Sequence, residues 1–307
     1  MSGTLTVFDR ALVRRRRDRA AAGLAAHDFL LREVGERLAD RLSDLRRRFP
    51  AALDLGCHDG TLATLLAGRG GIETLVQCDL SAAMAARAAA RGIALAADEE
   101  ALPFAPGAFD LVLSNLSLHW VNDLPGTLLQ IRHVLRPDGL FLAALLGGET
   151  LRELRAALVE AETAERGGAA PRVSPFAELR DAAGLLQRAG FALPVADLDT
   201  VTVTYPDALA LMRDLKGMGE ANAVLARDRR PATRRLMARA AAIYHEHHGD
   251  AGGRVPATFQ VLFLTAWAPH PAQQRPLRPG SARTRLADAL GATEGRLPPG
   301  GGAGGRG

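Results

Sequence analysis

The sequence predicts an α/β protein with a doubly wound, mostly parallel sheet that carries helices on both faces. One observation is that, over residues 50–148, short apolar runs alternate with stretches whose apolar residues recur every three or four positions. Another is the glycine-rich stretch LDLGCHDG, residues 53–60, which continues the first apolar run into a tight turn. Strands that alternate with helices at this spacing favour parallel pairing with both faces of the sheet covered.

The N-terminal part, residues 1–49, is expected to form a helical extension, because apolar positions such as Leu38 and Leu42 recur three to four apart among charged residues. Residues 50–148 are expected to form the Rossmann-like core of the sheet. The expected strands of this core are residues 51–55, 74–78, 93–97, 109–114 and 140–145. The expected helices between them are residues 62–67, 82–90 and 124–135.

Residues 149–268 are expected to add a helical cap and to complete a seven-stranded sheet. Charged helical stretches follow Gly148, and two β-like runs, residues 195–204 and 258–267, are separated by a mostly helical segment. We expect these two runs to add antiparallel strands at one edge of the sheet, with the helical segment between them forming the cap.

The last residues, 269–307, are rich in Pro, Gly, Ala and Arg and end in GGGAGGRG. Such a composition buries too little apolar surface to fold alone, so we expect a disordered tail. A chain that ends near Ala282 should therefore melt at nearly the same temperature as the full chain, which thermal denaturation of both would check. A drop of many degrees in the shortened chain would show that the tail packs on the body.

Composition narrows the class of protein. Hydrophobic residues make up 48% and charged residues 23% of the 307 residues, and no apolar run approaches the ~20 residues that a membrane span needs. No secretory signal is visible, so we expect a cytoplasmic protein. The formal net charge of +4 is modest and acidic residues are scattered among the arginines, which argues against a nucleic-acid partner. Cys57 and Cys78 are expected to be buried thiols.

The strongest local motif is LDLGCHDG, because it lies where the first strand turns into the first helix of the core. Gly56 and Gly60 let the backbone approach a ligand closely, and the next helix presents free amide groups to the polar part of that ligand. Asp54 and Cys57 belong to the same motif and are candidate binding residues. Taken alone, the motif also fits an ordinary tight turn between a strand and a helix.

Acidic residues follow the next two strands. Asp79, followed by Leu80, ends the second strand, where a carboxylate can accept hydrogen bonds from both hydroxyls of a ribose. Asp98 and Glu99 precede the segment LPF, residues 102–104, where adenine can be held by its amino group and its apolar face. A dehydrogenase that uses NAD shares the first features, but the DLGC form and the acidic-LPF segment favour S-adenosylmethionine. We therefore predict a class I methyltransferase fold that binds this cofactor.

The segment SNLSLHW, residues 114–120, follows the fourth strand and reaches the carboxyl edge of the sheet, where ligands of such folds bind. We expect Ser114 and Asn115 to flank the methionine part of the cofactor or the reacting group. His119 is a candidate general base, because an unperturbed imidazole titrates near pH ~6.5, although it fits equally well as a cap of the following loop. Trp120 is expected to pack over the cofactor or to close the pocket.

With these motifs in place, the chain resembles the family of mitochondrial complex I assembly factors that are protein-arginine hydroxylases, and their alphaproteobacterial relatives. The shared segments are VFDRALVRRRRDRAA, ADEEALPF, LHWVNDLPGTLLQI, LRPDGLFLAALLGGETLREL, VSPF, YPDALALMRDLKGMGEAN, VPATFQ and RPGSA. GMGEAN and VPATFQ are specific, because methyltransferases in general lack them. One departure is His58, which stands where the usual methyltransferase loop has a third glycine.

The resemblance implies an enzyme that hydroxylates an arginine of an iron–sulfur subunit of respiratory complex I during its assembly, with room for peripheral contact at the inner membrane. Hydroxylation needs an oxidant and often a metal. The sequence shows no convincing set of two histidines and one carboxylate, so no metal site is predicted. The group formed by His245, His247 and His248 fits the surface of a charged helix better than a metal site.

Two alternatives stay open. More distantly, the chain resembles the methyltransferase that esterifies malonyl-carrier protein in biotin synthesis, which shares the SNLSLHW and GGETLREL segments but lacks GMGEAN and VPATFQ. A third alternative is a non-catalytic assembly chaperone in which the bound cofactor only stabilises the fold.

The cap would set the choice of acceptor. Its candidate pocket residues are Met212, Met218, Gly219, Glu220 and Asn222. Core packing explains the two methionines better than substrate contact does. Glu220 is the strongest candidate, because a carboxylate can orient an arginine guanidinium through two hydrogen bonds. The competing interpretation makes it a residue at the end of a helix that matters only for stability.

Overall fold

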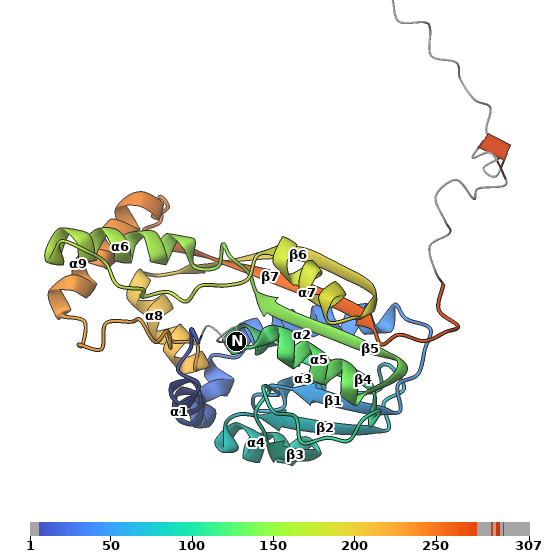
Figure 1. Ribbon diagram of the computed structural model, residues 1–307. Helices are drawn as coiled ribbons and strands as arrows, with labels where there is room; N and C mark the ends of the chain where they lie inside the picture. Colours follow the sequence, from blue (N-terminus) through green and yellow to red (C-terminus); the bar gives the residue numbers. More distant parts are fainter. Residues whose placement is uncertain (1–5, 275–283, 285–286, 289–290, 292–307) are drawn as a thin grey trace, which may run out of the picture. The chain divides into compact units, whose positions relative to one another are not determined.

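The computed structural model describes residues 6–274, 284, 287–288 and 291, and the statements below concern these residues. The chain divides into two units, Met1–His270 and Pro271–Gly307, and the named strands and helices belong to the first (Figure 1). Most of the predicted tail, residues 269–307, lies outside the described residues, so its disorder stays a prediction. Among the described residues, no helix has both the length and the apolar character needed to cross a membrane.

The described part of the first unit is organised by a seven-stranded sheet in the order β3-β2-β1-β4-β5-β7-β6. The strands are β1 (Ala51–Leu55), β2 (Thr74–Asp79), β3 (Ile93–Ala96), β4 (Phe109–Asn115), β5 (Leu135–Leu146), β6 (Ala192–Tyr205) and β7 (Val255–Trp267). The first five pair in parallel with one another, and β7 pairs antiparallel with both β5 and β6. The predicted doubly wound, mostly parallel sheet is confirmed.

The last two strands form one edge of the sheet through antiparallel pairing, as expected, but in an order that the sequence did not predict. β7 lies between β5 and β6, so β6 alone forms that edge of the sheet. Because β6 is antiparallel to β7, it runs in the same direction as β5, and only β7 is reversed. β5 also begins earlier than expected: Leu135 already pairs with Phe109, although the following Pro137 and Gly139 are typical of a turn.

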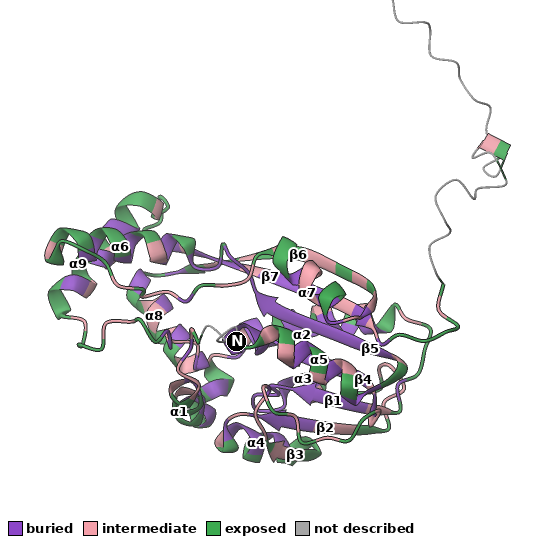
Figure 2. Cartoon of the chain, in the orientation of Figure 1, coloured by how far each residue is buried: buried purple, intermediate pink, exposed green. Residues whose placement is uncertain are grey.

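Helices cover both faces of the sheet. One face carries α2 (Phe29–Ser43), α3 (Thr61–Leu65) and α4 (Ala82–Ala88), and the other carries α5 (Leu124–Val134) and α7 (Leu179–Arg188). Leu38 and Leu42 of α2 are buried with Leu111 of β4, whereas Ile131 of α5 and Leu186 of α7 are buried on the opposite side. Figure 2 shows buried strands between helices whose outer sides are exposed.

The cap lies beyond the carboxyl ends of the parallel strands. Its helices are α6 (Arg152–Arg166), α8 (Ala208–Met218) and α9 (Arg234–His248). α6 follows β5, α8 follows β6, and α9 leads into the reversed strand β7, so all three lie at the same end of the sheet (Figure 1). The N-terminal helix α1 (Arg10–Ala20) is separated from α2 by a short 3₁₀ helix, Ala21–Ala26, and packs against α4 and α8. It therefore also reaches the edge where ligands of such sheets bind.

Candidate active site

The turn from β1 to α3 uses left-handed backbone conformations. Gly56 and Gly60 have φ angles of +73° and +83°, which glycine adopts without strain. His58 has a φ of 50°, which is costly for a residue with a Cβ atom and accounts for the glycine that methyltransferase loops usually carry there. A Cβ atom at Gly60 would lie 2.7 Å from Oε1 of Gln77 and 3.0 Å from Cα of Ala88. The two glycines thus let the loop pack closely against neighbouring protein atoms, and its approach to a ligand stays a prediction.

Asp54 is fully buried near the end of β1, and within the described part of the chain neither of its carboxyl oxygens has a hydrogen-bond partner. Burial, helped by the nearby Asp79 carboxylate, raises the pKa of Asp54 to about 8. A buried carboxyl without partners is costly, so this position favours a ligand with a cationic or hydrogen-donating group. Cys57 and Cys78 are buried free thiols, as predicted.

The raised pKa of Asp54 makes stability depend on pH. Between ~3.9, the pKa of an unfolded aspartate, and about 8, the folded carboxyl keeps a proton that the unfolded one has lost. Stability therefore falls as pH rises through this window, and Asp54→Asn should gain about 1.4 kcal/mol on the wild type for each pH unit. Urea unfolding across this range measures the difference, with Asp44→Asn at an exposed position as control. A difference that is constant with pH would contradict the assignment.

Asp79, at the end of β2, already has partners for both carboxylate oxygens. Oδ1 accepts the backbone N–H two residues further on at 2.8 Å, and Oδ2 accepts N–H groups from His58 and from Nη1 of Arg17, each at 3.1 Å. The completely buried Arg17 side chain also donates to Glu99 at 3.3 Å and to Oγ of Ser117 at 2.9 Å. Burial disfavours the charged guanidinium, but Asp79 and Glu99 outweigh it and hold the pKa of Arg17 above its usual range. α1 thus places a positive charge among the predicted cofactor-binding acids.

A second arginine of α1 holds the acidic pair that follows β3. Nη2 of Arg10 donates to Oδ1 of Asp98 at 2.6 Å and to Oε2 of Glu99. Burial opposes the ionisation of Glu99, but Arg10 and Arg17 lower its pKa to about 2. The sequence pattern did not single out either arginine. One signal was available, because Arg17 lies three residues before Ala20 on the buried side of α1.

The side chains at the end of β4 hold neighbouring elements. Oγ of Ser114 donates to the carbonyl oxygen of Leu55 in β1 at 2.7 Å, and Nδ2 of Asn115 donates to that of Leu31 in α2 at 2.8 Å. Oδ1 of Asn115 is buried and has no partner among the described residues. Oγ of Ser114 can still accept a hydrogen bond, and the amide oxygen of Asn115 is left for a ligand, so the expectation that both side chains flank the cofactor stays a prediction.

Beyond β4, the neighbouring residues His119 and Trp120 meet Glu220, which lies 101 and 100 residues further along the sequence. Oε2 of Glu220 accepts a hydrogen bond from Nε1 of Trp120 at 2.8 Å and lies 2.9 Å from Nε2 of His119. Because a carboxylate only accepts, Nε2 of His119 carries the hydrogen of this bond, and its Nδ1 is buried without a partner in the described part of the chain. Burial opposes the ionisation of Glu220, but His119 and Arg17 outweigh it and hold its pKa below the usual range.

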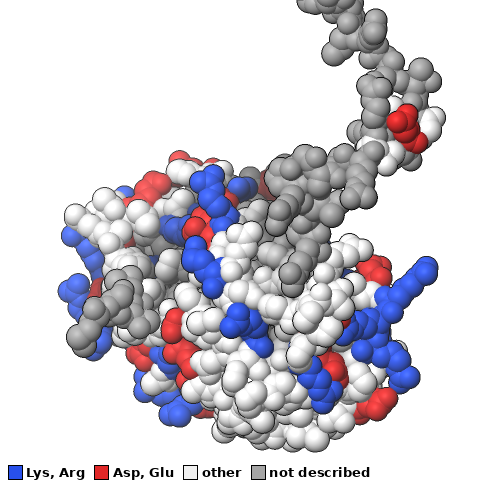
Figure 3. All heavy atoms as spheres, turned by 45° about the vertical axis from the view of Figure 1, so that its right-hand side comes forward, with Lys and Arg blue, Asp and Glu red and all other residues white. Residues whose placement is uncertain are grey.

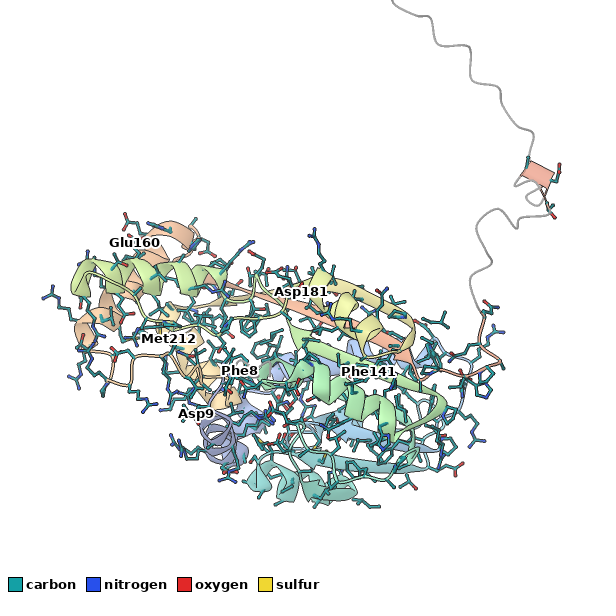
Figure 4. The ribbon with its side chains drawn as sticks, viewed as in Figure 1. Phe8, Asp9, Phe141, Glu160, Asp181 and Met212 are labelled. Carbon is teal, nitrogen blue, oxygen red and sulfur yellow. The ribbon has the colours of Figure 1, made fainter. Side chains whose placement is uncertain are left out.

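Trp120 closes the junction between the sheet, the N-terminal segment and the cap. Its side chain is buried, and its ring meets that of Phe8 edge-on with centroids 5.3 Å apart. Leu80 packs against the same cluster. Figure 4 shows Phe8 between the sheet and the cap helix α8. The backbone N–H of the next residue, Asp9, donates to the carbonyl oxygen of Ala223 at 2.9 Å. Trp120 therefore fills the space between the sheet, the N-terminal segment and the cap.

A cavity of about 500 Å³, here called the cap cavity, is bordered by Glu220 together with Met212 of α8 and Asn222. Met212 is labelled on α8 in Figure 4. Met218, by contrast, is buried in the core, and Gly219 ends α8 with a φ of +84° and does not line this cavity. Oε1 of Glu220 accepts no hydrogen bond from the described residues, whereas Oε2 accepts two. Glu220 thus borders the cap cavity and also contacts His119 and Trp120, which follow β4.

The fold and this arrangement define an enzyme of the methyltransferase superfamily. A family profile described as a methyltransferase domain matches residues 53–143. The YcgJ protein from Bacillus subtilis superposes with a TM-score of 0.54 at 12% identity, over 76% of this chain and 98% of that one. Phosphoethanolamine N-methyltransferase 2 of Haemonchus contortus, solved in complex with S-adenosyl-L-methionine, superposes with a TM-score of 0.53 at 16% identity. The match covers 84% of this chain and 60% of that one. These likenesses show the class I methyltransferase fold.

Sequence relatives narrow the class further. The chain is 46% identical to the mitochondrial arginine-hydroxylase NDUFAF5 of Danio rerio, over 92% of this chain and 89% of that protein, and 43% identical to the human protein, over 97% and 87%. The malonyl-[acyl-carrier protein] O-methyltransferase of a Methylovorus species is 35% identical, over 94% and 96%. The chain belongs to the NDUFAF5 arginine-hydroxylase family, which confirms the resemblance seen in its motifs.

Proposed function

We propose that this chain binds S-adenosylmethionine at the carboxyl edge of the sheet and modifies an arginine side chain that a protein partner inserts into the cap cavity. The observation that carries the proposal is the pair formed by Glu220 and His119, which joins the cavity to the end of β4. The name of the relatives supports hydroxylation as the reaction. Molecular oxygen would supply the atom inserted into a C–H bond, and a two-electron donor from outside the chain would reduce the second oxygen atom to water. The partner we propose is an iron–sulfur subunit of complex I, met in the cytoplasm at the periphery of the inner membrane.

The residues at the edge of the sheet fit S-adenosylmethionine. Asp79 would bind the ribose hydroxyls, Glu99 the adenine amino group, and the unpartnered Asp54 the cofactor's ammonium group. When bound, the cofactor supplies an electrophilic methyl group on a sulfonium. Both oxygens of Asp79 already have partners, so Arg17 has to leave Oδ2 before a ribose hydroxyl can use it.

The cap cavity fits an arginine side chain. A guanidinium carries a permanent charge, and its fork of N–H groups matches a carboxylate. Oε1 of Glu220 would accept one of these N–H groups, while Oε2 keeps His119 and Trp120 in place. Nδ1 of His119 would accept a proton released during the reaction. The buried ring of Trp120 would keep water away from this end of the cavity.

Asp79→Ala should weaken the binding of S-adenosylmethionine at least about tenfold, because hydrogen bonds to a buried carboxylate contribute ~1.5–3 kcal/mol each. Calorimetric titration of the purified proteins measures the affinity, and melting temperatures show that the variant is folded. Glu73→Ala is the matched control, since this exposed residue directly precedes the other end of β2. Unchanged affinity in a folded Asp79 variant would contradict the placement of the ribose.

Mass spectrometry of complex I subunits from cells with and without this gene tests the proposed function. Loss of an added oxygen from one arginine supports the hydroxylase. A lost methyl group would favour the methyltransferase alternative, to which the malonyl-carrier-protein relatives point. A complex whose subunits show no modification in either strain, and which fails to assemble without the gene, would favour the non-catalytic chaperone.

A further inference from the structure

A second cavity, of about 480 Å³, lies between α1, the 3₁₀ helix that follows it, and α8. Its basic lining side chains are Arg16, Arg19, His27, Arg213 and Lys216, and no acidic residue is among the described residues that line it. We call it the cationic pocket. Like charges brought together around one cavity repel one another, so such a pocket favours an anionic occupant.

The arginine and lysine side chains of this pocket form no ion pair with a carboxylate of the described residues. The side chains of Arg19 and Lys216 make no hydrogen bond or ion pair within the described part of the chain. Arg16 and Arg213 donate to backbone carbonyl oxygens only. Burial and repulsion from Arg227 and Arg19 lower the pKa of Arg16. On the face drawn in Figure 3, by contrast, several basic side chains lie beside acidic ones.

The acids next to these residues in the sequence already have other partners: Asp18 accepts a hydrogen bond from Ser81, and Asp28 pairs with Arg32. Asp214 accepts hydrogen bonds from Nδ1 of His27 at 2.5 Å and from the hydroxyl of Tyr205 at 2.9 Å. These bonds fix the imidazole ring against α8, where a Cβ atom at Gly217 would lie 2.2 Å from its Cδ2 atom. Gly217 is therefore needed so that α8 can approach His27. The contacts of His27 with α8 fix this wall of the pocket.

The cationic pocket adjoins the cap cavity, because Arg16 and Ala221 line both. Two other arginines that line the cap cavity are paired, Arg172 with Glu162 at 2.6 Å and Arg227 with Asp9 at 3.3 Å, whereas Arg229 has no ion pair among the described residues. Arg16, which has no carboxylate partner among the described residues, thus places positive charge where the cap cavity adjoins the cationic pocket. A chain that inserts a side chain into the cap cavity would place its neighbouring residues over this side.

We propose that the cationic pocket binds acidic side chains of the protein partner that lie next to the arginine entering the cap cavity. The inference rests on the proposed function, since it assumes a protein substrate. Carboxylates match arginine through paired hydrogen bonds and lysine through its charge, and such contacts steer a partner into register before the arginine is engaged.

Fluorescence anisotropy with two labelled peptides tests the proposal. One peptide carries an arginine followed by glutamates, and its counterpart carries glutamines instead. We expect the acidic peptide to bind roughly tenfold more tightly at low salt, and Arg19→Glu/Lys216→Glu to remove that preference. Arg14→Glu/Arg15→Glu is the matched control, because these exposed residues of α1 change the net charge equally and do not line the pocket. Equal losses in both folded variants, or no preference in the wild type, would overturn the proposal.

Zero-length cross-linking gives an independent readout. Lys216 is the only lysine of the sequence, so a carbodiimide that joins carboxylates to amines should attach the acidic peptide at Lys216, and Lys216→Arg should remove this cross-link while preserving binding. Inorganic phosphate that binds while the peptide fails to cross-link would overturn the protein-docking role. An acidic peptide whose arginine is replaced by glutamine should still cross-link, which separates failure of this inference from failure of arginine modification.

Discussion

Arg17→Met is expected to lower the free energy of unfolding by about 3–5 kcal/mol, because removing one partner of a buried ionic network leaves the others uncompensated. The guanidinium of Arg17 is completely buried between the carboxylates of Asp79 and Glu99 and also donates to Ser117. Methionine keeps an unbranched apolar stem of similar length, so the packing of α1 changes little. Urea unfolding at neutral pH measures the change.

Arg15→Met is the control, because Arg15 lies on the same helix at an exposed position. If the free energy of unfolding falls no more in the Arg17 variant than in this control, the stabilising role of Arg17 is contradicted. Acid unfolding adds a second readout. Glu99 has a folded pKa of about 2, below its unfolded ~4.3, so its contribution is present above pH ~4.3 and is lost as pH falls toward 2. Without Arg17 the pKa of Glu99 rises, and this contribution is lost at higher pH.

Glu220→Gln is expected to abolish arginine modification while leaving the affinity for S-adenosylmethionine nearly intact. The amide keeps the size of the side chain but removes the charge that holds His119 and that would bind a guanidinium. The proposed cofactor residues, by contrast, belong to the sheet and precede Trp120. Calorimetry measures the cofactor affinity, and mass spectrometry of the partner subunit from cells that carry the variant measures modification.

Stability must be measured beside activity for this variant, since Glu220 also accepts the hydrogen bond of Trp120. Glu160→Gln is the matched control, because Glu160 is exposed on α6 of the same cap (Figure 4). Normal modification by the Glu220 variant, or modification lost only in step with unfolding, would rule out its role at the acceptor site.

Local patterns carried most of the fold prediction. The alternation of strands and helices, and the turn that needs glycine at Gly56 and Gly60, are readable within short windows, and both are present as expected. Strand order is different, because the insertion of β7 between β5 and β6 depends on where the cap returns the chain to the sheet. The alternation of apolar and polar residues along β6 or β7 does not indicate which strand lies beside which.

The sequence predicted which acidic residues belong to the candidate site, but it did not predict the partners with which they form ion pairs and hydrogen bonds. Asp79, Glu99 and Glu220 were singled out by their positions after strands or within a family motif. Their partners were not, since Arg17 lies 62 residues from Asp79 in the sequence, and His119 lies 101 residues from Glu220. Such contacts come from the packing of α1 and the cap onto the carboxyl edge, which a single sequence does not display.

The most direct test of the central claim is co-expression of the iron–sulfur subunit with this chain in a host that lacks both genes, followed by mass spectrometry of the arginine-containing peptides. We expect one arginine to gain an oxygen with the wild-type chain, and none to do so with Asp79→Ala or Glu220→Gln at equal folded protein levels. A subunit that binds the wild-type chain and stays unmodified, or that is modified equally by both variants, would contradict the claim that this site modifies arginine.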